Sequence, residues 1–151
     1  MHEVPAMPLE VVRVDHWTQV RAKLWEWSPF FTPEEMADSK SGALTYRPAF
    51  MNWLVGIRYL FDAPMVIASG YRTPAHQALL TKDRTTGSHV DAEAVDIRIS
   101  GQAAWDLHQI ATANGVMGLG VHQSGDFATR YLHLDRWTQA PDGVRPRLWD
   151  Y

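Results

Sequence analysis

The sequence predicts an α+β fold, a single domain in which helices pack against a small, mainly antiparallel sheet. Its 151 residues fit one domain of ordinary size. Apolar residues recur at helical spacing in the first part of the chain. Short segments that alternate between apolar and polar residues follow in the second part, separated by further helical segments. Helices that come first, followed by short strands mixed with helices, are typical of α+β proteins.

The N-terminal part of the chain is predicted to hold two short helices. Residues 1–15 are expected to be extended or loop. A helix is predicted over residues 16–27, where apolar side chains recur every three to four positions. Thr32 can cap a second helix, Pro33 suits its first position and Glu35 completes a capping box.

Helix and strand signals alternate in the middle of the chain. Apolar residues at helical spacing predict a helix over residues 48–61. Residues 65–68 form a short apolar run that is typical of a buried strand. The pair Thr73 and Pro74 repeats the cap-and-proline start, which predicts a helix over residues 74–80.

The last third of the chain supplies most of the expected sheet. Residues 94–99 and residues 131–135 alternate as half-buried strands do. A helix is predicted over residues 102–114, because Gly115 can end it. Residues 116–121 read as a Gly-rich strand. The tail from residue 138 is expected to be loop, with aromatic side chains that dock back onto the domain.

Composition excludes several functions. The chain has no Cys, so disulfides, thiolate catalysis and every Cys-based zinc site are excluded. Any metal must therefore be bound by His nitrogen or carboxylate oxygen. A net charge of −3 argues against a partner bound through phosphate contacts, so no nucleic acid is expected. No stretch approaches the ~18 apolar residues of a membrane helix, so no membrane partner is expected.

Two segments concentrate imidazoles and carboxylates. His89 ends a polar loop, and Asp96 interrupts an apolar strand seven residues later. On the later strand, Tyr131, His133 and Asp135 share one face. Two His and one carboxylate suffice for a catalytic zinc with water in its open position. Spacing alone leaves open the simpler interpretation of a loop His and a solvent-facing carboxylate.

Five motifs follow one another along the chain, and they read FFTPEEM at residues 30–36, SGYRTPAH at 69–76, SHVDAEAVD at 88–96, GLGV at 118–121 and LHLD at 132–135. In this order they resemble the motifs of the D-Ala-D-Ala carboxypeptidase-like zinc peptidases. These are peptidoglycan-cleaving enzymes of the hedgehog/DD-peptidase fold, and the phage endolysins and tail-associated members are similar in character. The resemblance covers about residues 29–136, and it depends on the order and spacing of the motifs together.

The resemblance implies roles for individual residues. His89, Asp96 and His133 stand where the family has its zinc ligands. Arg72 stands where relatives contact a carboxylate or amide carbonyl of the substrate, a task suited to a bidentate guanidinium. Ser88 is expected either to hydrogen-bond substrate or a ligand residue, or simply to cap its loop.

Two departures from the family pattern matter. Ala92 replaces the motif's glycine, and a left-handed backbone there would be strained. Several branches have an acid three residues before the last zinc His, where this chain has Arg130. Asp135 is the next candidate for the general base, although it could instead hydrogen-bond a zinc His. His122 and Trp137 are expected to line the substrate cleft.

The resemblance implies one activity. Residues 1–28 are expected to form an N-terminal extension with a helix, residues 29–137 the zinc peptidase-like domain, and residues 138–151 a tail that packs on it. The domain would hydrolyse a peptide or D-amino-acid amide bond in bacterial peptidoglycan with zinc-activated water. Its partner would then be the peptidoglycan stem peptide.

The expected place of action follows from the same resemblance. No signal peptide is recognised, which predicts synthesis in the cytoplasm. The protein would reach the wall through a phage lysis system or as part of a phage virion, beside other virion proteins. The alternative is an inactive family member that serves as a structural or binding part of a virion, which Ala92 and Arg130 favour. A third interpretation is a D-Ala-D-Ala dipeptidase with a small cytosolic substrate.

Overall fold

The computed structural model describes residues 10–141 and 143–151, which form two sheets flanked by helices. The mixture of elements confirms the predicted α+β class. The strands are β1 (Val12–Val14), β2 (Leu44–Tyr46), β3 (Val66–Ser69), β4 (Ala94–Arg98), β5 (Gly118–His122), β6 (Tyr131–Asp135) and β7 (Arg147–Asp150). The helices are α1 (Pro33–Met36), α2 (Pro48–Phe61), α3 (Pro74–Leu80) and α4 (Gly101–Ala113), with 3-10 turns η1 (Trp17–Gln19), η2 (Ala22–Leu24) and η3 (Phe127–Thr129).

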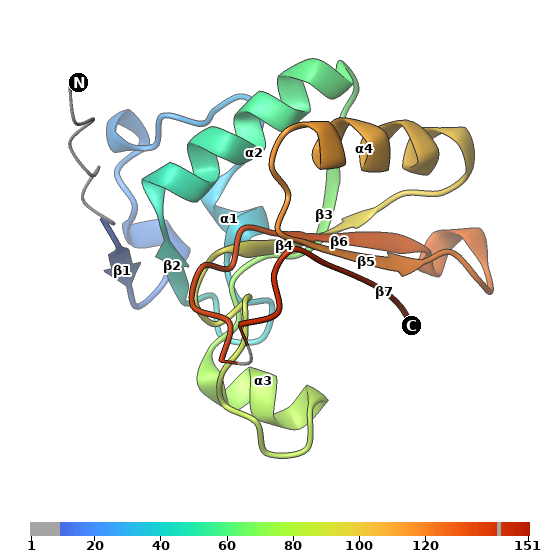
Figure 1. Cartoon of the computed structure of the whole chain (residues 1–151). Coiled ribbons are helices and arrows are strands. Elements are labelled where there is room, and N and C mark those ends of the chain that lie inside the picture. The colour runs from blue at the N-terminus through green and yellow to red at the C-terminus, as the bar shows by residue number, and fades with distance from the viewer. Residues whose placement is uncertain (1–9, 142) are drawn as a thin grey trace, which may run out of the picture.

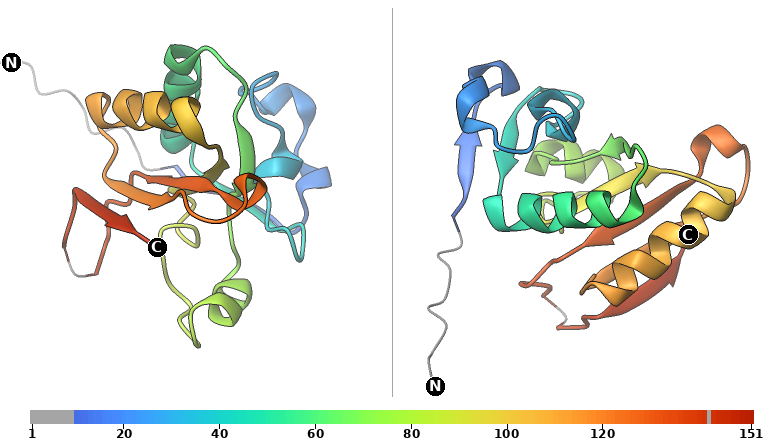
Figure 2. Two further views of the ribbon diagram at one scale, coloured as in Figure 1. Left: turned by 90° about the vertical axis from the view of Figure 1, so that its right-hand side faces the viewer. Right: turned by 90° about the horizontal axis from the view of Figure 1, so that it is seen from above.

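The larger sheet has five strands in the order β3-β4-β6-β5-β7, and the smaller sheet pairs β1 with β2. Every pairing is antiparallel except that of β5 with β7, which is parallel. α2 and α4 lie over one face of the larger sheet, whereas α3 lies on its other side (Figure 1). The β1–β2 pair stands at the side of the domain away from β7 (Figure 2).

The hydrophobic core lies between the two long helices and one face of the larger sheet. Val95 and Ile97 of β4 and Leu132 and Leu134 of β6 are buried on this face. Their alternation leaves the intervening residues of both strands to the opposite face. The helices contribute the buried residues Phe50, Met51, Leu54 and Ile57 from α2, and Ala104, Leu107 and Ala111 from α4.

Local helix signals predict three of the helices well. The capping box is present, because Thr32 accepts from the backbone of Glu35 and the Glu35 carboxylate accepts from Thr32. α2 and α3 begin at Pro48 and Pro74, as predicted. Among the described residues, no helix is both long enough and apolar enough to cross a bilayer.

The helix predicted over residues 16–27 is wrong, because the structure has the 3-10 turns η1 and η2 there. The reason lies with Trp25 and Trp27, which are both buried and both pack edge-on against Tyr46. Residues two apart in an α-helix point in nearly opposite directions. An α-helix could not bury both indoles against one ring, and tertiary packing overrides the local periodicity.

The two edges of the larger sheet also differ from expectation. The strand predicted to be buried at residues 65–68 is the edge strand β3, in which Val66 is exposed. The tail predicted to be loop forms β7, which closes the other edge beside β5. Parallel pairing joins segments that are distant in the chain, so no local turn signal announces it.

Candidate metal centre

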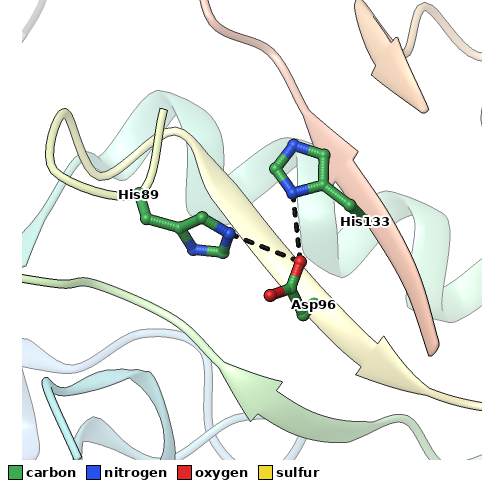
Figure 3. Close-up of side chains that lie close together, drawn as sticks. All are labelled: His89, Asp96 and His133. Carbon is green, nitrogen blue, oxygen red and sulfur yellow. Dashed lines mark hydrogen bonds and ion pairs between the residues drawn. The ribbon is translucent and has the colours of Figure 1, made fainter. Parts of the chain in front are cut away.

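The site is centred where β4 and β6 run side by side. Asp96 pairs in register with His133, so their side chains lie next to each other on one face. His89, from the loop before β4, points at the same carboxylate (Figure 3). The Asp96 Oδ1 atom lies 3.0 Å from His133 Nδ1 and 3.3 Å from His89 Nε2. All three residues are buried, and one ligand atom from each lies within 4.8 Å of the others.

This set of donor atoms fits a zinc ion. Two imidazole nitrogens and one carboxylate oxygen, with a fourth position open, are a usual ligand set of hydrolytic zinc. Ligand bonds of about 2.1 Å in a tetrahedron separate the ligand atoms by roughly 3.4 Å. The distances from Asp96 to the two imidazoles are already close to that separation. The structure thus brings together the three predicted ligands.

The SGYR motif orients His89 through its glycine. The His89 Nδ1 atom lies 2.7 Å from the carbonyl oxygen of Gly70. When Nδ1 carries the proton for this hydrogen bond, the lone pair of Nε2 is free to bind a metal. A Cβ at position 70 would lie 2.5 Å from the carbonyl oxygen of Met36. Glycine is therefore required at position 70 to let the strand end pass α1 and reach His89.

Ala92 adopts the left-handed conformation that the sequence identified as strained. Its φ angle is +57°, and its backbone N–H donates to the carbonyl of His89 at 3.2 Å. Alanine in this region costs on the order of 1 kcal/mol more than glycine. The turn that presents His89 is thus retained in this chain without the residue that best suits it.

Asp135 lies behind His133, on the ring edge away from Asp96. The His133 Nε2 atom is 2.7 Å from Asp135 Oδ2, whereas Nδ1 is directed at Asp96. Asp135 is fully buried and also accepts the backbone N–H of Trp137. A Cβ at Gly118 would overlap its carboxylate, which explains the first glycine of the GLGV motif. Of the two roles left open for Asp135, these contacts favour orienting His133.

The C-terminal segment, which includes β7, contributes residues that the sequence interpretation did not assign to the site. Arg145 approaches Asp135 through Nε and Nη2, each 3.3 Å from a carboxylate oxygen. The Trp149 ring lies 5.0 Å from the His133 ring and occupies the space above Gly120. The alternation of residues 147, 149 and 151 on one side of the strand was the available signal.

Arg72 lies inside the site, where it binds a proposed metal ligand. Its guanidinium donates to Asp96 Oδ2 at 3.0 Å, to Ser69 Oγ at 3.0 Å and to Gln77 Oε1 at 3.2 Å. These contacts fix Asp96 so that Oδ1 faces both imidazoles. Contact of Arg72 with substrate stays a prediction. Ser88 is buried beside His89 and lines the cleft described below, and its role stays a prediction.

A buried carboxylate outside the motifs holds the Arg72 segment in place. Asp38 accepts hydrogen bonds from the backbone of Thr73 at 2.9 Å and from Ser41 at 2.9 Å, and it lies 2.8 Å from His76 Nδ1. Burial opposes its ionisation, but these hydrogen bonds outweigh burial and lower the pKa of Asp38 to about 2. Asp38 thereby ties the end of α1 to the start of α3.

The remaining predicted residues are distributed around the centre. His122 stacks on Tyr131 with ring centroids 4.9 Å apart, and among the described residues its buried Nδ1 has no hydrogen-bond partner. Trp137 donates from Nε1 to Asp91 at 2.6 Å and lines the cleft. Arg130 donates to the carbonyl of Gly125 and covers Phe127, so the position that holds an acid in other branches carries a cation here.

Electrostatics favour the metal-binding forms of Asp96 and His89, whereas they favour the protonated form of His133. Burial alone would raise the pKa of Asp96, but the two imidazoles outweigh it and hold that pKa below its usual range. Burial lowers the pKa of His89 despite the nearby Asp96, so His89 is held neutral. Burial acts likewise on His133, but its hydrogen bonds to Asp135 and Asp96 outweigh it and raise the pKa.

Two cavities lie on opposite sides of the larger sheet. A cleft of about 540 Å³ adjoins the site and is lined by α3, by the loop that carries His89 and by the C-terminal segment. A larger cavity of about 930 Å³ lies between α4 and the core face, with mainly apolar walls such as Trp105 and Leu148. The metal-binding cluster of the described residues adjoins the smaller cleft, so the chemistry is assigned there.

The comparisons with known proteins agree with this geometry. A family model described as Peptidase M15 matches residues 29–135. The matched range contains His89, Asp96 and His133 but ends before Arg145 and Trp149. Comparison with curated proteins and with solved structures found no match.

Proposed function

Because the chain belongs to the Peptidase M15 family, we propose that it is a zinc-dependent peptidase acting on bacterial peptidoglycan. It would hydrolyse a peptide or D-amino-acid amide bond of the stem peptide or cross-bridge. The observation that carries this proposal is the buried cluster of His89, Asp96 and His133 at the end of an open cleft. Zinc bound there would polarise the scissile carbonyl and supply a water of lowered pKa.

The chain's own residues would hold and orient this centre. Asp135 would keep His133 turned so that its Nδ1 faces Asp96, and the carbonyl of Gly70 would keep His89 turned so that its Nε2 faces Asp96. We assign Asp135 this orienting role instead of proton transfer, because its oxygens already accept from His133, Arg145 and Trp137. His122, on the same face of the sheet, is then the neighbouring candidate for accepting the proton.

A phage setting is the finer part of the proposal. The likeness of the motifs to phage endolysins and tail-associated enzymes supports a role in opening the wall during phage release or entry. An inactive virion component is the alternative, and two observations favour it. Ala92 carries backbone strain at the turn before β4, and Arg130 stands where other branches place an acid.

A wall-digestion assay separates the two functions. Zinc-saturated protein incubated with purified peptidoglycan should release new amine ends, and mass spectrometry of the fragments would identify the cleaved bond. The release should stop on chelation, return with added zinc and be absent in His133→Ala. An intact wall after incubation with the zinc-saturated protein, beside a positive control that digests it, would rule out the peptidase and leave the structural role.

A further inference from the structure

The cleft beside the metal centre has a cationic wall. Its volume of about 540 Å³ falls within the ~300–1,000 Å³ typical of small-ligand sites. His89 lines one end, so the cleft is continuous with the metal centre. Arg84, Arg145 and Arg147 line the rest with Trp137 and neutral polar residues, and no carboxylate lines it among the described residues. Any group that occupies this cleft lies in a positive potential.

The three arginines differ in whether a carboxylate of the protein already pairs with their charge. Arg145 is half-buried and engaged by Asp135, so it contributes little free charge. Arg84 and Arg147 are exposed, and neither lies within ion-pair distance of a carboxylate in the part of the chain that the structure describes. The Arg147 guanidinium lies 5.4 Å from the centre of the Trp149 ring, which keeps it beside the site.

We propose that this cleft recognises a carboxylate on the residue next to the scissile bond, and that it therefore selects stem peptides with diaminopimelate over lysine. The proposal rests on the peptidoglycan peptidase function proposed above. The two residues share a long side chain that ends in an amine, and diaminopimelate adds a carboxylate beside that amine. Lysine would place only a cation among Arg84, Arg145 and Arg147, whereas the added carboxylate gives guanidinium groups a bidentate partner.

The cleft is built from segments inside the matched family range and from a segment beyond its C-terminal end. Arg84 comes from the loop after α3, inside residues 29–135, whereas Arg145 and Arg147 come from the C-terminal segment beyond it. The proposed selectivity therefore depends on one arginine inside the matched range, Arg84, and on one beyond it, Arg147.

The test uses three otherwise identical stem peptides, carrying diaminopimelate, its side-chain-carboxamide form, or lysine. Binding to the zinc-loaded protein is measured by calorimetry at low and moderate salt, and kcat/KM is measured in parallel. Because two cations in the cleft are exposed, the diaminopimelate peptide should bind about tenfold more tightly than either of the others. Added salt should reduce this difference in affinity. The double variant Arg84→Ala/Arg147→Ala should lose the preference. Arg13→Ala/Arg21→Ala, which changes the net charge equally at exposed sites outside the cleft, should keep it.

The binding measurement tests this inference, and the cleavage measurement tests the proposed function. Equal binding of the three peptides, a preference for lysine, or a preference that survives in Arg84→Ala/Arg147→Ala would overturn the inference, even if all the peptides are cleaved. If no peptide is cleaved but the diaminopimelate preference appears and depends on the two arginines, the peptidase function fails and the carboxylate site stands.

Discussion

The two faces of the β4–β6 strand pair are both buried, but they are stabilised differently. On the helix-covered face, Leu132 and Leu134 join the apolar core, where packing is non-directional. On the opposite face, Asp96, His133 and Asp135 are also almost inaccessible, and each is bonded to a partner of defined geometry. Buried charged groups are costly unless paired. The same alternation therefore yields one face that holds the fold together and one that preserves a chemical arrangement.

The largest effect is expected at Asp96, whose Oδ1 contacts both imidazoles. Asp96→Asn removes the charge from the centre of the ligand set, so we expect a loss of zinc affinity above the ~10–100-fold typical of lost outer contacts. Peptidase activity should disappear with the metal. Competition against a chromophoric chelator measures the affinity, and Asp106→Asn on the exposed face of α4 is the control. Wild-type affinity in Asp96→Asn would remove Asp96 from the site.

Substitutions on the core face should change the free energy of unfolding instead of the zinc affinity. Leu134→Ala deletes a fully buried side chain, which we expect to cost ~2–5 kcal/mol in the free energy of unfolding. Leu148→Ala, at a side chain 71% exposed, should change it by less than ~0.5 kcal/mol. Denaturant unfolding of the metal-free proteins gives both values. Equal costs for the two leucines would contradict the assignment of the faces.

A smaller effect is expected at Arg145, which acts on the polar face through Asp135. Arg145→Ala leaves the buried carboxylate without its cation, and His133 then loses part of its orientation. Zinc affinity should fall by ~10–100-fold, as for other outer contacts of metal ligands. Arg147→Ala, two residues further along at the start of β7, should leave zinc affinity unchanged, because Arg147 makes no contact with Asp135 among the described residues. If both variants bind zinc alike, Arg145 has no orienting role.

The smallest effect, and the one stabilising change, is expected at Ala92. Ala92→Gly relieves the left-handed strain, although glycine also gains entropy in the unfolded chain. The net gain should be roughly 0.5 kcal/mol in the free energy of unfolding, with zinc affinity retained. Denaturant unfolding measures it, with Ala113→Gly at the end of α4 as the contrasting variant that should destabilise. A loss of stability in Ala92→Gly would show that the turn carries no strain.

Period-two spacing within short segments predicted the strand alternation, whereas the three ligands were predicted from the resemblance of the motifs to those of a zinc peptidase family. Asp96 and His133 lie on strands whose pattern alone sets which face they occupy. The position of Trp149 depends on parallel pairing of β7 with β5, which the alternation of residues 147, 149 and 151 does not by itself reveal, and Arg145 lies in the segment that leads into β7. The buried indoles of Trp25 and Trp27 likewise broke a predicted helix through packing with Tyr46. The features set by neighbouring residues could be predicted from the sequence, whereas the contacts between distant segments that complete the site could not.

The central claim is that one zinc ion binds on the polar face of strands β4 and β6, beside the loop that carries His89. X-ray absorption at the zinc edge of the loaded protein, with metal content measured on the same sample, tests it most directly. We predict one zinc per chain, with two imidazoles and light oxygen ligands at about 2.0–2.2 Å, and one imidazole fewer in His133→Ala. A spectrum without imidazole scattering, or one unchanged in His133→Ala, would contradict the account.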